Sequence, residues 1–143
     1  MAARPPPDSP SHRSSWATGA RIAAADIAAS PTDRTLLLAT TERGVATSTD
    51  GGRTFAPPRS STVQLFLAWP AASALYGLDL TGMLSVSADA GATWKRVSTI
   101  PGGGPQAFTA VDEGHLLAAT SDGIYESRDA GATFTRILPL AEG

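Results

Sequence analysis

The stretch STDGGRTF, residues 48–55, places a hydroxyl, a carboxylate and two adjacent glycines within eight positions. Serine and aspartate side chains act as nucleophiles in many enzymes, and glycine lets a backbone approach a ligand closely. The same residue types favour tight turns, because an aspartate side chain accepts hydrogen bonds from nearby backbone amides. The stretch is therefore either a site of chemistry or a turn.

Two further copies of this stretch decide between the alternatives. SADAGATW occupies 87–94 and SRDAGATF occupies 127–134, so all three copies fit S-x-D-x-G-x-T followed by an aromatic residue. Ser48 and Ser87 are 39 residues apart, and Ser87 and Ser127 are 40 apart. A structural device recurs with a repeat architecture, whereas a catalytic site is usually single. The spacing predicts three structural turns rather than a catalytic site.

Each turn is expected to use its residues in the same way. The aspartate accepts from amides of its own turn, the glycine takes a positive φ, and the aromatic side chain packs into the core. The residues concerned are Ser48, Asp50, Gly52, Thr54, Phe55, Ser87, Asp89, Gly91, Thr93, Trp94, Ser127, Asp129, Gly131, Thr133 and Phe134.

Composition excludes several classes of function. The 143 residues are 42% hydrophobic, which is enough for the core of one domain. The net charge of −2 favours neither nucleic acid nor an anionic membrane as a partner. The chain has no cysteine, and its only histidines are His12 and His115, so we expect no disulfide, no metal site and no cofactor.

The first residues differ in composition from the rest of the chain. Residues 1–19 are rich in proline and serine and contain no apolar run of signal-peptide type, so we predict a disordered segment there. No later run approaches the roughly 18 apolar residues of a membrane span. The domain is predicted over 20–143, with three repeats at about 20–58, 62–101 and 105–140.

Short runs rich in apolar and β-favouring residues divide each repeat into four. They occupy 106–111, 115–121, 123–129 and 133–138 in the third repeat. They occupy 63–69, 74–80, 83–89 and 93–100 in the second repeat, and 22–29, 35–41, 44–50 and 54–57 in the first. Four short strands in about 40 residues, without a helical period, are typical of a propeller blade. The prediction is an all-β propeller segment of three four-stranded antiparallel blades, with the motif between strands three and four.

The repeated motif is that of the Asp-box, or BNR repeat, S-x-D-x-G-x-T-W. Asp-boxes occur in sialidases, sortilin-type receptors, a photosystem assembly factor and bacterial propellers described as glycosyl hydrolases. Residues 20–139 resemble the C-terminal blades of the last group, which is sialidase-like, as in TLLLATTERGVATSTDGGRTFAP and HLLAATSDGIYESRDAGATFTRIL. The resemblance implies Asp-boxes at the periphery, away from the active face, and relatives that are secreted or in the cell envelope.

A sialidase active site, as the resemblance implies it, uses three arginines, a tyrosine paired with a glutamate, and an aspartate. No residue here is assigned to that set by a motif, and Tyr76 and Tyr125 lie within predicted strands, where we expect them to pack. Two hypotheses follow. The chain is a non-catalytic module that binds a glycan or protein ligand or assists assembly, or it belongs to an exo-α-sialidase-type hydrolase of glycoconjugates.

Three other features are assigned to structure rather than to chemistry. PGGGP at 101–105 lacks the spacing and the following helix of a phosphate-binding loop, so it is expected to connect two blades. Asp112 and Glu113 are adjacent, whereas catalytic carboxylate pairs need a set separation of roughly 5 to 9.5 Å across a cleft. His115 begins a strand without a partner in the sequence.

The loops joining strands two and three, together with the connections between blades, should emerge opposite the repeated turns. These loops carry the charged residues that we expect to face any small polar ligand near the central channel. They are Glu42, Arg43, Arg59, Asp79 and Asp122.

Three blades are too few to close a ring, since propellers have about 4 to 8. The terminal sheets should then expose apolar faces, with Leu36 and Leu38 at one end and Leu116, Ile124 and Tyr125 at the other. Exposed patches of this kind mark interfaces. We therefore expect self-association or additional upstream blades.

Overall fold

The structure is a computed structural model that describes residues 24–139. The segment predicted to be disordered, 1–19, lies outside the described residues, as do the predicted ends of the first and third repeats at 20–23 and 140. Within the described part, no helix has the length and apolar character to cross a membrane.

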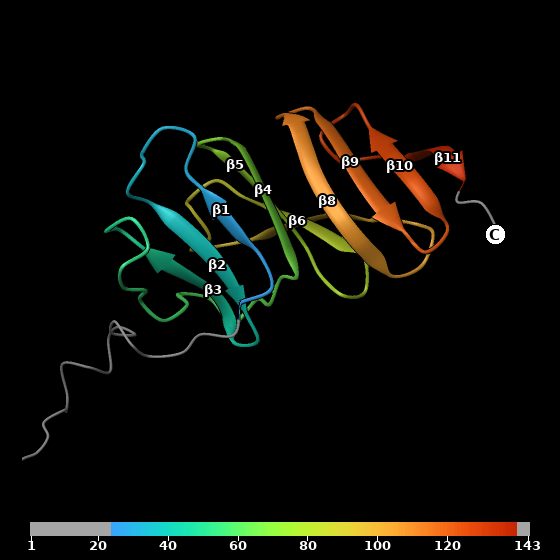
Figure 1. Ribbon diagram of the computed structural model, residues 1–143. Helices are drawn as coiled ribbons and strands as arrows, with labels where there is room; N and C mark the ends of the chain where they lie inside the picture. Colours follow the sequence, from blue (N-terminus) through green and yellow to red (C-terminus); the bar gives the residue numbers. More distant parts are fainter. Residues whose placement is uncertain (1–23, 140–143) are drawn as a thin grey trace, which may run out of the picture.

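The chain forms three antiparallel sheets, each of which follows the order of the chain (Figure 1). The first contains β1 (Ile27–Ala29), β2 (Leu37–Thr41) and β3 (Gly44–Ser48). The second contains β4 (Phe66–Ala71), β5 (Ala74–Leu78), β6 (Met83–Ser87) and β7 (Lys95–Thr99). The third contains β8 (Pro105–Asp112), β9 (His115–Thr120), β10 (Gly123–Ser127) and β11 (Thr135–Pro139). The all-β prediction and its division into three antiparallel sheets are confirmed.

The first sheet departs from the predicted four strands. Where a fourth strand is predicted, at 54–57, only one bridge forms, between Thr47 and Ala56. The Ala56 N–H donates to the Thr47 carbonyl at 2.7 Å. Pro57 and Pro58 follow immediately and have no N–H to donate, so the ladder cannot continue.

The second sheet is covered on both faces by its neighbours. Every residue of β5 is buried. Side chains alternate along a strand, so Leu75 packs against Leu38 and Val45 of the first sheet, while Tyr76 joins the core shared with the third sheet. Leu38 and Leu75 are both fully buried, and such burial contributes about 1.5–3 kcal/mol for each side chain.

Hydrogen bonds connect each sheet to the next, and the first strands of the sheets are in contact. β4 contacts both β1 and β8, so the first strands of the three sheets lie next to one another (Figure 1). Asp26 Oδ2 accepts from the Leu67 N–H at 2.9 Å and joins the first sheet to the second. Tyr76 Oη donates to the Glu113 carbonyl at 2.6 Å and joins the second to the third.

The predicted apolar end faces are partly wrong. Leu38 is buried against the second sheet, and Leu116 and Tyr125 are buried there from the other side. Ile124 is half-buried and, by strand alternation, lies on the opposite face of the third sheet from Tyr125. The prediction placed the adjacent residues Ile124 and Tyr125 on one face, although successive side chains of a strand point to opposite faces. Leu36, just before β2, is half-buried.

Candidate functional site

The repeated motif forms a turn closed by its own side chains, which we call the S-x-D turn. In the first copy, Ser48 Oγ donates to Asp50 Oδ1 at 2.8 Å and accepts from the Gly52 N–H at 2.9 Å. Asp50 Oδ1 also accepts from the Thr54 N–H at 2.9 Å, and Asp50 Oδ2 accepts from Thr54 Oγ1 at 2.6 Å. Both carboxylate oxygens are therefore engaged within the turn.

The second and third S-x-D turns repeat this network. Ser87 Oγ and Ser127 Oγ each accept from the glycine N–H four residues later at 2.8 Å. Hydrogen bonds from Thr93 lower the pKa of Asp89 to about 2, and those from Thr133 do the same for Asp129. The pKa of Asp50 is likewise lowered by Thr54. Carboxylates held ionised by donors of their own turn are poorly suited to give or take protons near neutral pH.

The glycines of the S-x-D turns meet a steric and a conformational demand. Gly52, Gly91 and Gly131 have φ values of +97°, +88° and +91°, a region that L side chains rarely adopt. A Cβ at Gly131 would also collide with the Leu84 side chain. Among the aromatic residues that follow, Trp94 packs between the first and second sheets, Phe134 packs between the second and third, and Phe55 is half-buried.

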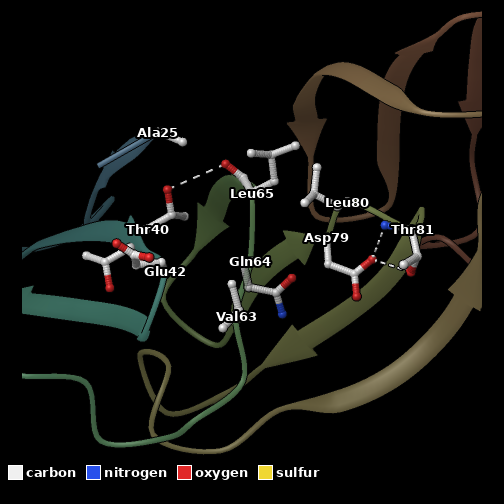
Figure 2. A pocket seen from close by; sticks show the side chains of 10 residues that line it. Ala25, Thr40, Glu42, Val63, Gln64, Leu65, Asp79, Leu80 and Thr81 are labelled. Carbon is white, nitrogen blue, oxygen red and sulfur yellow. Dashed lines mark hydrogen bonds between the residues drawn. The ribbon is translucent and has the colours of Figure 1, made fainter. Parts of the chain in front are cut away.

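A cavity of about 540 Å³ lies at the other end of the strands, between the first and second sheets (Figure 2). It is formed by the β2–β3 loop, the segment before β4 and the β5–β6 loop. β3 runs from this end at Gly44 to its S-x-D turn at Ser48, so the cavity and the turns are at opposite ends of the strand. The lining residues are Ala25, Thr40, Thr41, Glu42, Val63, Gln64, Leu65, Asp79, Leu80 and Thr81.

The structure brings together two of the five charged loop residues that the sequence suggested. Glu42 and Asp79 line the cavity from opposite walls, whereas Arg43, Arg59 and Asp122 are not among its lining residues.

The other three have different surroundings. Arg59 reaches the second S-x-D turn, where its guanidinium donates to the carbonyls of Asp89 and Ala90 at 3.2 and 3.3 Å. Asp122 accepts from Tyr125 Oη at 2.6 Å and pairs with Arg136 at 3.0 Å. The Arg59 guanidinium therefore contacts an S-x-D turn and does not line the cavity. Arg43 is exposed.

The two cavity carboxylates retain free acceptor capacity. Asp79 Oδ1 accepts from the Thr81 N–H and Oγ1 at 2.9 and 2.6 Å and from the Met83 N–H at 3.0 Å, which shapes the β5–β6 loop. Asp79 Oδ2 and the Glu42 carboxylate have no hydrogen bond or ion pair with any residue of 24–139. A ligand with hydrogen-bond donors therefore finds acceptors on both walls.

Gln64 is a polar lining residue that the sequence analysis missed. Its side chain is only 3% exposed, and its Oε1 has no hydrogen-bond partner within the described chain. It packs on Gly77 of β5, where an added Cβ would lie 2.5 Å from the Gln64 Cδ. Glycine inside a strand often marks such a close approach, so Gly77 in ALYGLDL was the available signal.

Aliphatic side chains make up the rest of the cavity mouth. Leu80 is 72% exposed and Val63 is 46% exposed, while Leu65 is half-buried beside them. Figure 2 shows these three side chains around the opening, with Gln64 between the two walls. The cavity therefore combines exposed apolar surface with unpaired carboxylate and amide oxygens.

The remaining candidates are accounted for elsewhere in the fold. His115 Nε2 lies 2.6 Å from Glu126 Oε2 in the third sheet, and this hydrogen bond lowers the pKa of Glu126. Asp112 Oδ1 accepts from the Gly114 N–H at 2.9 Å in the β8–β9 turn. Residues 24–139 hold no group of three or more histidine or acidic residues suited to a metal ion.

The two strand tyrosines and the glycine-rich segment pack as expected. Tyr76 and Tyr125 are 3% and 6% exposed, which confirms their assignment to the interior. The segment at 101–105 connects β7 to β8 and therefore joins the second sheet to the third. Gly102 in it has a φ of +98° and lies against the Tyr125 ring, where a Cβ would not fit.

Comparisons with known proteins identify the fold. No protein-family model matches the chain, and no curated protein matches it. YCF48 from Cyanidioschyzon merolae matches with a TM-score of 0.69 and 20% identity over 85% of this chain and 39% of that one. A structure of YCF48 bound to D1 peptide matches with a TM-score of 0.66 and 18% identity, over 85% of this chain and 42% of the other.

Glycoside hydrolases are also among the similar structures. The GH74 xyloglucanase from Xanthomonas campestris has a TM-score of 0.58 and 20% identity over 87% of this chain and 22% of that chain. The chain thus spans less than half the length of each of these proteins. These neighbours are β-propeller proteins, and the three sheets described above are those of a propeller segment.

Proposed function

We propose that this chain is a non-catalytic propeller segment that binds a segment of another protein at the cavity between the first and second sheets. The observation that carries the proposal is the cavity itself, in which exposed aliphatic side chains adjoin unpaired acceptors on Glu42, Gln64 and Asp79. Pockets of this composition, mostly apolar with a few directed polar groups, are typical of binding sites. The binding of a peptide by the similar protein YCF48 gives further support.

The finer assignment of the turns belongs to this proposal. We regard the three S-x-D turns as Asp-boxes of a BNR-type propeller that resembles the bacterial sialidase-like group. Their closed hydrogen-bond networks support a purely structural role. We then expect a ligand site at the opposite end of the strands, where the cavity has hydrogen-bond acceptors without partners among the described residues.

The binding proposal is tested with a random library of N-acetylated, C-amidated octapeptides presented to the immobilised chain. We expect selection of a recurrent peptide motif, and we expect Leu80→Ser to weaken its capture because the variant removes exposed aliphatic surface from the cavity mouth. Ala72→Ser, at an exposed position of the β4–β5 loop outside the lining, is the control. The absence of any selected motif would refute the proposal.

The alternative function is that of an exo-α-sialidase-type glycoside hydrolase. The similarity to GH74 enzymes favours it at the level of the fold. Glycoside hydrolysis generally needs a placed acid and a second carboxylate or equivalent nucleophile, and Asp79 already uses one oxygen to hold its own loop. We expect no hydrolysis of a fluorogenic sialoside by the purified chain. Turnover that disappears in Glu42→Gln or Asp79→Asn would establish the hydrolase instead.

Self-association is the second part of the proposed behaviour. Leu117, Ala119 and Ile124 are half-buried on the face of the third sheet that no described sheet covers, and Leu138 beside them is 53% exposed. We propose that a second copy or further blades cover this face, because a closed propeller ring needs about 4 or more blades and the described chain forms three sheets.

Size-exclusion chromatography with light scattering tests this part. We expect a mass above the 14.6 kDa of one chain. Leu117→Lys should shift the distribution towards the monomer, whereas Ala72→Lys in an exposed loop should not. A cooperatively melting monomer of the unaltered chain would contradict the proposal.

A further inference from the structure

We propose that the cavity between the first and second sheets selects a cationic side chain, lysine or arginine, presented by the bound peptide. This inference rests on the proposed binding function and specifies the chemistry of the ligand. The expected ligand group is a cation that carries hydrogen-bond donors at the end of an aliphatic stem.

The first argument is the sign of the charge. Glu42 and Asp79 stand on opposite walls (Figure 2), and neither forms an ion pair with a lysine or arginine of the described residues. Asp79 Oδ2 is free to accept, because the bonds that shape its loop all go to Oδ1. A recess lined by one sign of charge concentrates ligands of the opposite sign. Carboxylate and phosphate ligands are accordingly disfavoured.

The second argument is the buried amide between the two walls. Gln64 Oε1 is shielded from solvent and has no hydrogen-bond partner in the described chain. A buried acceptor without a donor is costly, and the torsion of a terminal amide is broad, so a small rotation can present this oxygen to the cavity. Ammonium and guanidinium groups carry several donors and no acceptor, which matches the unpaired acceptors of Glu42, Asp79 and Gln64.

The third argument is the apolar surface next to these oxygens. Val63 and Leu80 are exposed at the mouth, and Leu65 lies beside them. Lysine and arginine bury their methylene stems along apolar surface while their charged groups reach polar partners. The same side chain can therefore contact the aliphatic mouth and the acceptors deeper in the cavity. A wholly apolar ligand would leave Gln64 and both carboxylates unsatisfied.

The experiment uses the octapeptide library and a selected peptide measured by titration calorimetry. We expect enrichment of lysine or arginine at one position. Replacing that residue by norleucine should weaken binding at least about tenfold, since charge-assisted hydrogen bonds are lost. Glu42→Gln and Asp79→Asn should each weaken it about three- to tenfold, and affinity should fall as salt screens the charges.

Two variants separate the proposed contact from general effects. Gln64→Leu removes the unsatisfied oxygen, so it should weaken binding while the melting temperature is unchanged or higher, because an apolar residue of similar size lacks the unmet acceptor. Asp112→Asn alters the net charge equally but lies in the β8–β9 turn, outside the cavity, and should leave affinity unchanged.

The possible results distinguish the two proposals. The cation inference is overturned if the selected motif contains no lysine or arginine. It is also overturned if affinity is unchanged in Glu42→Gln, Asp79→Asn and Gln64→Leu. Peptide binding stands in both cases. The absence of any selected peptide overturns both.

Discussion

The two ends of the strands use acidic residues in opposite ways. In the S-x-D turns, Asp50, Asp89 and Asp129 accept hydrogen bonds on both carboxylate oxygens from their own turns. At the cavity, Glu42 and one oxygen of Asp79 accept none from the described residues. Residue type alone therefore does not distinguish a structural carboxylate from one available to a ligand. The difference is whether neighbouring residues, through their backbone amides and hydroxyl groups, already supply donors to both carboxylate oxygens.

The largest expected effect is on the turn side of this comparison. Gly131→Ala forces a Cβ into the Leu84 side chain and holds a non-glycine residue at a φ of +91°. Overpacking and backbone strain together should cost about 2–5 kcal/mol of unfolding free energy, measured by urea denaturation.

Gly51→Ala is the matched control for that substitution. Gly51 has a φ of +76° with no atom near its missing Cβ, and Ala90 and Ala130 hold φ values of 57° and 59° at the same position of the other turns. Its cost should not exceed about 1–2 kcal/mol. Equal costs for the two variants would mean that contact with Leu84 is not the main constraint at Gly131.

The next effect isolates the hydroxyl of an S-x-D turn. Ser87 is 1% exposed, and its Oγ accepts from the buried Gly91 N–H. Ser87→Ala leaves that donor unsatisfied and should cost about 1–3 kcal/mol in chemical denaturation, with peptide affinity of the folded protein unchanged. Ser121→Ala, at an exposed loop position, should be neutral. A loss of affinity without a loss of stability would move the turn into the binding site.

Acid should weaken the turns before it weakens the apolar cores. The pKa values of Asp89 and Asp129 are about 2 in the folded chain, against about 3.9 in an unfolded one. The unfolded state therefore binds more protons than the folded state between these pH values. The stability that the two ionised carboxylates contribute is complete above about pH 5 and is lost as pH falls towards 2. Melting temperatures from pH 7 to pH 2 should decline in that window, and Asp89→Asn should flatten the decline. A decline that Asp89→Asn does not alter contradicts this assignment.

The smallest effect is expected on the cavity side. Glu42 is exposed and has no partner among the described residues, so Glu42→Gln should change the unfolding free energy by less than about 0.5 kcal/mol. Differential scanning calorimetry of this variant beside Ser87→Ala measures both ends of the comparison. A marked destabilisation by Glu42→Gln would show that the carboxylate has a structural role and weaken its assignment to a ligand.

Most of the fold was predictable because its determinants are local and repeated. A period of about 40 residues with short apolar runs predicts the sheets, and the strands agree closely, as for 106–111 against Pro105–Asp112. The exception at 54–57 also has a local cause, in Pro57 and Pro58. The hydrogen bonds that the serine and aspartate side chains of the S-x-D turns make within their own turn join residues at most four apart, so the motif already contains both partners of each.

The cavity and its chemistry required the tertiary structure. Loop counting from the sequence grouped Glu42, Asp79 and Arg59. Glu42 and Asp79 line one cavity, whereas Arg59 bonds to residues about 30 positions away in the second turn. Gln64 acquires its role only when the segment before β4 crosses Gly77 of β5. Local sequence determines which groups can satisfy one another within a turn. Only the packing of one sheet on the next decides which acceptors remain unpaired. The groups around the cavity come from segments far apart in the sequence, and the repeat pattern does not show which of these segments come into contact.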